Sequence, residues 1–245
     1  ETYYSELTFY TEDSYHSPGI NVAISKIRRY ESVCYVADIC ITDIEQLKTG
    51  FAKGKFGSNL RDKVETIAKE HDAIIAISGD YYGIRQNGIV IRNGVLYRNN
   101  NDYEDVCVLY KDGTLKVFGK RMFNPEAEMK AGAYQSWCFG PKLLLGGKPI
   151  TDFKSSIKGV NPRCAIGFYE PGHYAFVVVD GRQKDYSKGL SLANLSELFY
   201  ELGCIEAYNL DGGQTAVMVF DGKAYSSPYK GGRSISDIVY LTETG

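Results

Sequence analysis

The 245-residue sequence lacks features that several classes of protein require. Its three histidines form no HxxxH or HxH pair and its six cysteines form no CxxC pair, which disfavours a zinc hydrolase or a histidine-based triad. No run of eighteen apolar residues is present, so the sequence contains no candidate membrane-spanning helix. The formal net charge is only -2 and no basic stripe appears, which argues against a nucleic-acid-binding module.

The cysteines are widely scattered and cannot be paired from their spacing. An even count permits disulfides in an exported protein. Buried free thiols are an equally good interpretation, because cysteine packs as a small apolar residue. Both remain open for Cys34, Cys40, Cys107, Cys138, Cys164 and Cys204.

Turn signals between β-rich runs indicate the fold class. Asn93-Gly94, Asp112-Gly113 and Asp221-Gly222 supply the positive φ angles that tight hairpin turns need, and Pro171-Gly172 marks a further hairpin. Hydrophobic residues make up 44% of the chain, enough to bury a large core without disulfides. We expect an α+β fold with a mixed, largely antiparallel β-sheet core and several packed helices.

Apolar periodicity predicts two helices. The first covers 58–71 with Ser58 as its N-cap, and the second covers 192–202 between Ser191 and Gly203. Strands are predicted within 20–41 and over 73–77, 165–169, 174–179, 205–210, 215–220 and 238–241, whereas 120–157 is less regular.

Three predicted strands are followed at once by glycine and polar residues. A strand end is rigid, and glycine lets the backbone approach a ligand closely. Asn209 and Asp211 lie two residues apart, so in a strand they face the same side. Asp-Gly after a strand can also be a plain turn, and this alternative stays open. The segments are Ser78-Gly79-Asp80, Asp180-Gly181-Arg182 and Asn209-Leu210-Asp211-Gly212-Gly213-Gln214-Thr215.

Two further arginines are candidate anion-binding residues. Arg163 precedes a predicted strand, and its planar guanidinium group matches a phosphate, although a surface salt bridge is an equal alternative. Arg233 follows Gly231-Gly232. That loop could bring it to a ligand or could simply be a flexible connection.

Taken together, these segments resemble the phosphodiester glycosidase family. The resemblance is dense from Ala73 to Leu241 and thin before it, so we expect one domain over 1–245 whose residues 1–72 are less typical. The motifs that carry it are ISGDYY at 77–82, NPRCAIG at 161–167, VVDGR at 178–182, NLDGG at 209–213 and RSISD at 233–237. Ser78, Cys164 and Gln214 depart from the usual family residues, which affects substrate detail more than reaction class.

The resemblance implies hydrolysis of a sugar 1-phosphodiester, typically α-linked N-acetylglucosamine 1-phosphate, without an organic cofactor. Bacterial relatives are often exported and associated with surface polysaccharides. We therefore expect an extracellular or cell-surface protein that acts on glycoconjugates such as exopolysaccharide, with a signal peptide or anchor that would precede Glu1.

The candidate residues can be given roles in such a reaction. Asp211 is the expected nucleophile or general base at the anomeric carbon, and Asp80 or Asp180 is the second carboxylate. A phosphate leaving group has a second pKa of about 6 and departs with little protonation. Its charge would be stabilised by Arg163, Arg182 and Arg233. Asn209, Gln214 and Thr215 would bind sugar hydroxyls or the acetamido group, and the substrate-binding set also includes Ser78, Gly79, Gly212 and Gly213.

Three alternatives remain open at this point. A phosphodiesterase would use the same site to cut a P–O bond. A non-catalytic glycan-binding module would keep the fold without turnover. Clustered Asp and Asn oxygens would also suit Ca²⁺ or Mg²⁺, although no metal ligand is assigned. The expected partner is a sugar-phosphate or glycan substrate.

Overall fold

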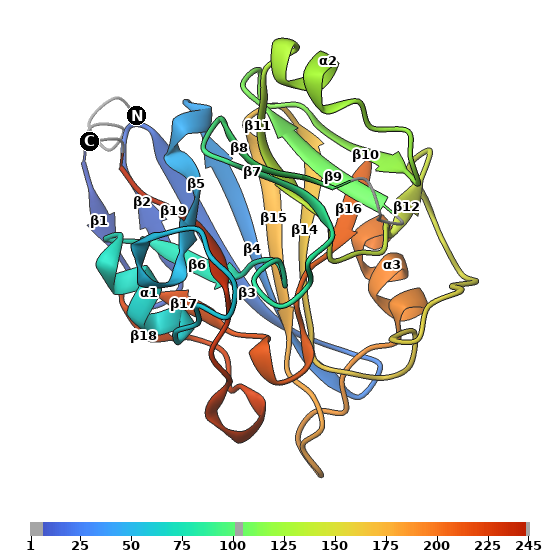
Figure 1. Ribbon diagram of the computed structural model, residues 1–245. Helices are drawn as coiled ribbons and strands as arrows, with labels where there is room; N and C mark the ends of the chain where they lie inside the picture. The colour runs from blue at the N-terminus through green and yellow to red at the C-terminus, as the bar shows by residue number, and fades with distance from the viewer. Residues whose placement is uncertain (1–6, 101–104, 244–245) are drawn as a thin grey trace.

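A seven-stranded sheet forms one side of the molecule (Figure 1). The structure is a computed structural model that describes residues 7–100 and 105–243. Every pairing recorded in this part of the chain is antiparallel, as the hairpin signals predict. In spatial order the strands are β1 (Phe9–Tyr10), β2 (Ser14–His16), β3 (Ile20–Arg29), β4 (Ser32–Ile41), β15 (His173–Val179), β14 (Arg163–Glu170) and β16 (Glu206–Asn209).

A five-stranded sheet packs against the first, and smaller sheets close one end. The five strands are, in order, β18 (Lys223–Ala224), β17 (Met218–Phe220), β6 (Ile75–Ser78), β19 (Asp237–Leu241) and β5 (Leu47–Phe51). The smaller sheets contain β10 (Leu115–Gly119), β9 (Asp105–Tyr110) and β11 (Ala133–Trp137), the pair β7 (Gly88–Arg92) and β8 (Val95–Asn100), and the pair β12 (Leu144–Leu145) and β13 (Lys148–Pro149).

The main hydrophobic core lies between the two large sheets. In β3, buried Ile20, Val22 and Ile24 alternate with exposed residues, because successive side chains of a strand point to opposite faces. These residues pack in one cluster with Ile75 of β6 and Val239 of β19. The alternation in the sequence therefore determines which face of each sheet is buried.

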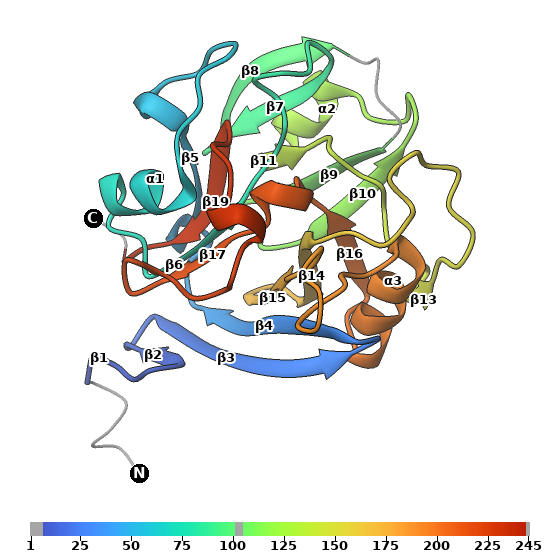
Figure 2. The same ribbon diagram turned by 90° about the horizontal axis from the view of Figure 1, so that it is seen from below.

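Helices cover the outer faces of both sheets (Figure 2). Helix α1 (Val64–Glu70) buries Val64 and Ile67 against the five-stranded sheet. Helix α3 (Leu192–Glu201) buries Leu195, Leu198 and Phe199 against the seven-stranded sheet. Ser191 caps α3 as predicted, since its side chain accepts a hydrogen bond from the amide of Asn194. No helix in the described ranges is long and apolar enough to span a membrane.

The helical content is lower than expected. The described residues contain three α-helices, α1, α3 and α2 (Pro125–Lys130), rather than several. The predicted helix start at Ser58 is wrong. Asn59 has a positive φ of 59° and the backbone of Asp62 pairs with Ile235, so the chain is extended there and α1 begins at Val64.

The predicted hairpins are confirmed. The turn between β7 and β8 has φ values of 50° at Asn93 and 80° at Gly94, as a two-residue hairpin turn requires. The predicted strand over 215–220 begins later, at Met218, because Gly213–Thr215 forms a 3-10 turn. The six cysteines, all of them described, are unpaired thiols, which answers the question that their spacing left open.

Candidate active site

Two strand ends from different sheets meet at the candidate site. The backbone amide of Asp211, after β16, donates to the carbonyl oxygen of Gly79, after β6, at 3.0 Å. The hydroxyl of Ser78 donates to the carbonyl of Asp211 at 2.9 Å. The structure therefore brings together two of the three polar segments that the sequence singles out.

Glycine is required at two of these positions because the backbone is crowded. A Cβ atom at Gly79 would collide with the carboxyl group and carbonyl of Asp237. A Cβ atom at Gly212 would lie 2.8 Å from the carbonyl oxygen of Pro162. Neither position adjoins open space, so the two glycines permit the close approach of the strands that form the site.

Asp211 has the properties of a reactive carboxyl group. The residue is only 5% exposed, and its Oδ2 atom has no hydrogen-bond partner. Burial raises its pKa to about 7, the neighbouring hydroxyl of Thr215 and the charge of Arg233 oppose this rise, and the charge of Asp80 adds to it. A carboxyl that titrates near neutral pH can exchange a proton during turnover.

Asp80 is fixed in place by backbone and side-chain hydrogen bonds. Its two carboxylate oxygens accept hydrogen bonds from the amides of Tyr81 and Cys138, each at 2.8 Å. Its own amide donates to the carboxylate of Asp237 at 2.7 Å. These contacts fix its charge near Asp211, where it acts on the pKa of that residue.

A buried ion pair between Arg92 and Asp237 packs next to Asp80. Arg92, which is 1% exposed, lies 2.8 Å from the carboxylate of Asp237 and 3.7 Å from that of Asp80. Asp237 is fully buried, which raises its pKa to about 6 although Arg92 opposes the rise. The single positive charge of the guanidinium group thus reduces the repulsion between the two carboxylates without balancing both of them.

A cavity of about 230 Å³ opens beside these residues. It gathers most of the substrate-binding residues predicted from the sequence, although they come from distant parts of the chain. Its polar lining consists of Asn161, Arg163, Arg182, Asn209, Gln214 and Arg233, together with the backbone of Gly212 and Gly213. We call this space the arginine cavity.

Arg182 and Arg233 are exposed and available to a ligand. Arg182 has a positive φ of 58°, which is uncommon for a residue with a side chain and is often found at functional sites. Its guanidinium group donates to Oδ1 of Asn161 at 2.8 Å and lies over the ring of Tyr229 at 5.7 Å. Two cationic groups at the cavity wall suit an anion such as phosphate.

Arg163 lines the same cavity but is largely committed to the backbone. It is 3% exposed and donates to the carbonyl oxygens of Leu190, Ile157 and Gly159. Burial and the neighbouring Arg182 lower its pKa to about 10, so it stays charged at neutral pH. Its contacts fix the cavity wall, and fewer of its donors remain for a phosphate.

Asn209 offers an unused acceptor at the site. Its side-chain amide donates to the carbonyl of Gly140 at 2.8 Å, while its buried Oδ1 atom has no partner. Gln214 donates to the carbonyl of Gly232, and the hydroxyl of Thr215 donates to that of Gly212. A buried acceptor without a partner is uncommon, and a hydroxyl or amide of a ligand would satisfy it.

Asp180 has different surroundings from the other two candidate aspartates. Its Oδ2 atom accepts hydrogen bonds from the hydroxyl of Tyr186 at 2.8 Å and the amide of Ser227 at 3.1 Å, whereas its buried Oδ1 atom has no partner, as at Asp211. Burial raises its pKa, and these hydrogen bonds oppose the rise. Within the described ranges, no recorded hydrogen bond or ion pair joins Asp180 to Asp211 or Asp80.

The described residues contain no group of three or more His, Cys, Asp or Glu side chains that could hold a metal ion. Asp80 and Asp237 both contact the guanidinium group of Arg92, at 3.7 Å and 2.8 Å.

Sequence reasoning missed several residues of the site. Arg92 precedes the Asn93-Gly94 turn and has no signal of its own. Arg85 and Phe139 lie in segments without clear periodicity. Asp237 is the last residue of the RSISD motif, and this motif is the sequence feature that could have identified it as a site residue.

Known proteins show clear similarity to this chain. A family model described as phosphodiester glycosidase matches residues 71–242. The SPbeta prophage-derived uncharacterized protein YomE of Bacillus subtilis strain 168 is 35% identical over 182 residues, which are 69% of this chain and 27% of that protein. The chain therefore spans about a quarter of the length of this relative.

Solved structures share the fold. The catalytic domain of zebrafish N-acetylglucosamine-1-phosphodiester alpha-N-acetylglucosaminidase, auto-inhibited by its pro-peptide, matches with a TM-score of 0.75 and 23% identity. That match covers 92% of this chain and 83% of the zebrafish chain. A hypothetical protein from Synechocystis matches with a TM-score of 0.64 and 13% identity, covering 92% of this chain and 62% of the other.

Proposed function

We propose, because the chain belongs to the phosphodiester glycosidase family, that it hydrolyses the bond between the anomeric carbon of a sugar and the phosphate of a 1-phosphodiester. One observation carries this proposal. The buried carboxyl group of Asp211 has a free oxygen and a pKa near 7, and it lies beside a cavity lined by three arginines. A phosphate that binds these arginines would leave its sugar-bearing oxygen close to that carboxyl group.

The proposed sugar is α-linked N-acetylglucosamine, which the name of the zebrafish protein also contains. Asn209 supports a substrate of this kind, because its unpartnered Oδ1 atom can accept a hydrogen bond from a hydroxyl or an acetamido N–H group. We also propose that the protein acts on extracellular or cell-surface glycoconjugates.

The chemistry follows from the charges at the site. Arg182 and Arg233 would stabilise the phosphomonoester as the C1–O bond breaks, and this leaving group needs little protonation. Asp211 in its ionised form would attack C1 or take the proton from the attacking water. Burial raises the pKa of Asp211, and the negative charge of Asp80 adds to this rise because it favours the protonated form of its neighbour.

The reaction can be tested with a panel of α-N-acetylglucosamine 1-phosphodiesters and UDP-N-acetylglucosamine, hydrolysed in heavy-oxygen water. We expect free N-acetylglucosamine to be released with the label at C1 of the sugar. Label in the phosphate would instead assign the protein as a phosphodiesterase. Binding of the substrates without any release would assign it as a glycan-binding module.

Asp180 has a positioning role in this proposal. The loop that contains Tyr186 follows Arg182, and the loop that contains Ser227 leads to Tyr229 and Arg233. By accepting hydrogen bonds from Tyr186 and Ser227, Asp180 joins the two loops whose arginines face the phosphate. It acts through these arginines and does not need to contact the reacting atoms.

Replacing Asp180 should therefore affect substrate binding more than the chemical step. Asp180→Ala removes both hydrogen bonds, and we expect KM to rise about tenfold, with kcat reduced much less. Asp180→Asn keeps an acceptor oxygen in the same place, so it should restore most of the lost affinity. A loss of kcat in Asp180→Asn as large as in an Asp211 variant would instead show that Asp180 takes part in the chemistry.

A further inference from the structure

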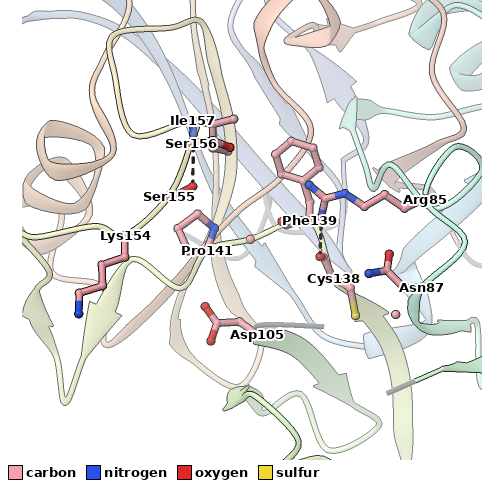
Figure 3. Close-up of a pocket in the computed structure, with 12 residues that line it drawn as sticks. Arg85, Asn87, Asp105, Cys138, Phe139, Pro141, Lys154, Ser155, Ser156 and Ile157 are labelled. Atoms are coloured by element: carbon pink, nitrogen blue, oxygen red, sulfur yellow. Dashed lines mark hydrogen bonds between the residues drawn. The ribbon is translucent and has the colours of Figure 1, made fainter. Parts of the chain in front are cut away.

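A second and larger cavity, whose lining residues are drawn in Figure 3, adjoins the arginine cavity. It encloses about 450 Å³. Phe139 and Ile157 line both cavities, so the two spaces share a wall. We call the larger space the Phe139 cavity. Its lining also includes Arg85, Asn87, Asp105, Pro141 and Ser155.

Asp211 lines neither cavity, but its chain neighbours Leu210 and Gly212 line the arginine cavity. Arg233 lines the arginine cavity and Arg85 lines the Phe139 cavity, and the charges of both lower the pKa of Asp211. Asn209 also contacts residues of both cavity linings. It lines the arginine cavity, and it donates hydrogen bonds to the carbonyl oxygens of Gly140 and Pro141, which line the other.

The chemical character of the Phe139 cavity differs from that of its neighbour. Arg85 donates to the carbonyl oxygens of Cys138 and Phe139 and stacks on the Phe139 ring at 4.9 Å. Its side chain therefore already has partners. Lys154 extends away from the other labelled side chains in Figure 3. Asp105 also lines the space, and its carboxylate accepts a hydrogen bond from the amide of Lys142 at 2.9 Å.

The remaining groups suit a neutral polyhydroxyl ring. Phe139, Pro141 and Ile157 provide apolar surface, as a sugar ring requires. The side-chain amide of Asn87 points into the cavity, and no hydrogen bond to it is recorded from the rest of the described chain. An amide supplies both a donor and an acceptor, which matches hydroxyl and acetamido groups.

We propose that the substrate is divided between the two cavities, with the phosphate in the arginine cavity and the sugar ring in the Phe139 cavity, where Asn87 is a specificity-determining residue. This inference rests on the proposed function, since it places the bond to be cleaved at the wall that the two cavities share, formed by Phe139 and Ile157.

The division can be tested by equilibrium binding, without turnover. Free N-acetylglucosamine and inorganic phosphate are titrated separately into the parent protein, Asn87→Ala and Arg233→Gln, and thermal unfolding checks that each variant is folded. Asn87 is half-buried and Arg233 is exposed, so neither substitution removes a core contact. Asn87→Ala should weaken N-acetylglucosamine binding at least about fivefold and leave phosphate binding within about twofold. Arg233→Gln should produce the opposite pattern.

Three outcomes would overturn the division. In the first, Asn87→Ala leaves the sugar affinity unchanged; in the second, it weakens phosphate binding instead. In the third, the folded parent protein fails to bind free N-acetylglucosamine at concentrations far above about 1 mM. The test is independent of the hydrolase proposal. If each variant loses affinity for only its own ligand but the parent protein shows no turnover, the division is supported and the proposed activity is contradicted. If the parent protein cleaves the C–O bond but Asn87→Ala binds N-acetylglucosamine as tightly as the parent, the activity is supported and the division is contradicted.

Discussion

Asp211→Asn is expected to lower kcat for phosphodiester hydrolysis by roughly a hundredfold to ten-thousandfold, the range associated with loss of a general acid or base. The amide can neither attack C1 nor accept a proton from water. The backbone hydrogen bonds of residue 211 to Gly79 and Ser78 do not involve the side chain, so the junction of the strands should remain intact. The measurement is kcat of purified parent and variant on the same phosphodiester. Activity within a few-fold of the parent would remove Asp211 from the mechanism.

The same residue should determine the pH dependence of activity. The pKa of Asp211 is about 7, and the proposed reaction uses its ionised form. We therefore expect kcat/KM to rise about tenfold per pH unit below pH 7 and to level off above it. If activity instead falls through pH 7, the protonated form of Asp211 is the active one and the residue acts as an acid.

Asp211→Asn should also stabilise the folded protein above pH 7. The folded-state pKa of about 7 exceeds the ordinary value of 3.8, so the folded protein retains a proton that the unfolded chain has already released. Stability is therefore lost as the pH rises from about 4 to 7, and the loss stays constant above that range. Removing the carboxyl group avoids this loss, although the new amide leaves a donor unpartnered, so we expect a net gain of roughly 1–3 kcal/mol at pH 8.

Denaturant unfolding at pH 8 and pH 4 checks the stability effect. The free energy of unfolding of Asp211→Asn should exceed that of the parent at pH 8. It should not exceed it at pH 4, where Asp211 is protonated in the folded parent protein. Asp152→Asn, at an exposed position, is the matched control and should show no such difference. A variant that is less stable than the parent at pH 8 would contradict the idea that Asp211 is a strained, functional carboxyl group.

Arg92→Met is expected to lower the free energy of unfolding by roughly 3–5 kcal/mol, because it leaves two buried carboxylates without their cation. Arg92 pairs with Asp237 at 2.8 Å and also donates to the carbonyl oxygens of Ile91 and Ser136. Such a loss is a large fraction of the total stability of an ordinary domain. Urea unfolding at pH 8 measures it, with the exposed Arg61→Met as the control.

Two further measurements identify the cause of the loss. The destabilisation should be smaller at pH 5, because Asp237, with a pKa of about 6, can then take up a proton. In the double variant Arg92→Met/Asp237→Asn part of the stability should return, since one of the unpaired charges is gone. If the double variant is as unstable as the sum of the two single variants, the ion pair is not the source of the effect.

Features that depend on neighbouring residues were accessible from the sequence. The Asn93-Gly94 turn joins two paired strands because these two residue types adopt positive φ without difficulty. The α3 helix begins at its predicted cap, since Ser191 meets the amide of a residue only three positions away. The segments at Ser78 and Asp211 were identified because polar residues directly follow buried strands.

Features that depend on distant residues were decided by the tertiary structure. Ser78 and Asp211 are 133 positions apart, and their hydrogen bond exists because strands from two different sheets end at the same place. The partnership of Arg92 with Asp237 spans 145 positions. Neither arrangement leaves a periodic or compositional trace in the sequence.

The same distinction separates the three candidate aspartates. In the sequence, Asp80, Asp180 and Asp211 look alike, since each follows a strand and stands beside glycine. Folding gives Asp80 two backbone donors and a buried arginine, and it gives Asp180 a tyrosine and a loop amide. Asp180 and Asp211 each keep one buried oxygen without a partner, and burial raises the pKa of both carboxyl groups, that of Asp211 to about 7. Residue type and local pattern determined where carboxylates could carry chemistry. Burial and hydrogen bonding, which arise only when the sheets pack together, decided the partners of each carboxylate and the direction in which its pKa moves.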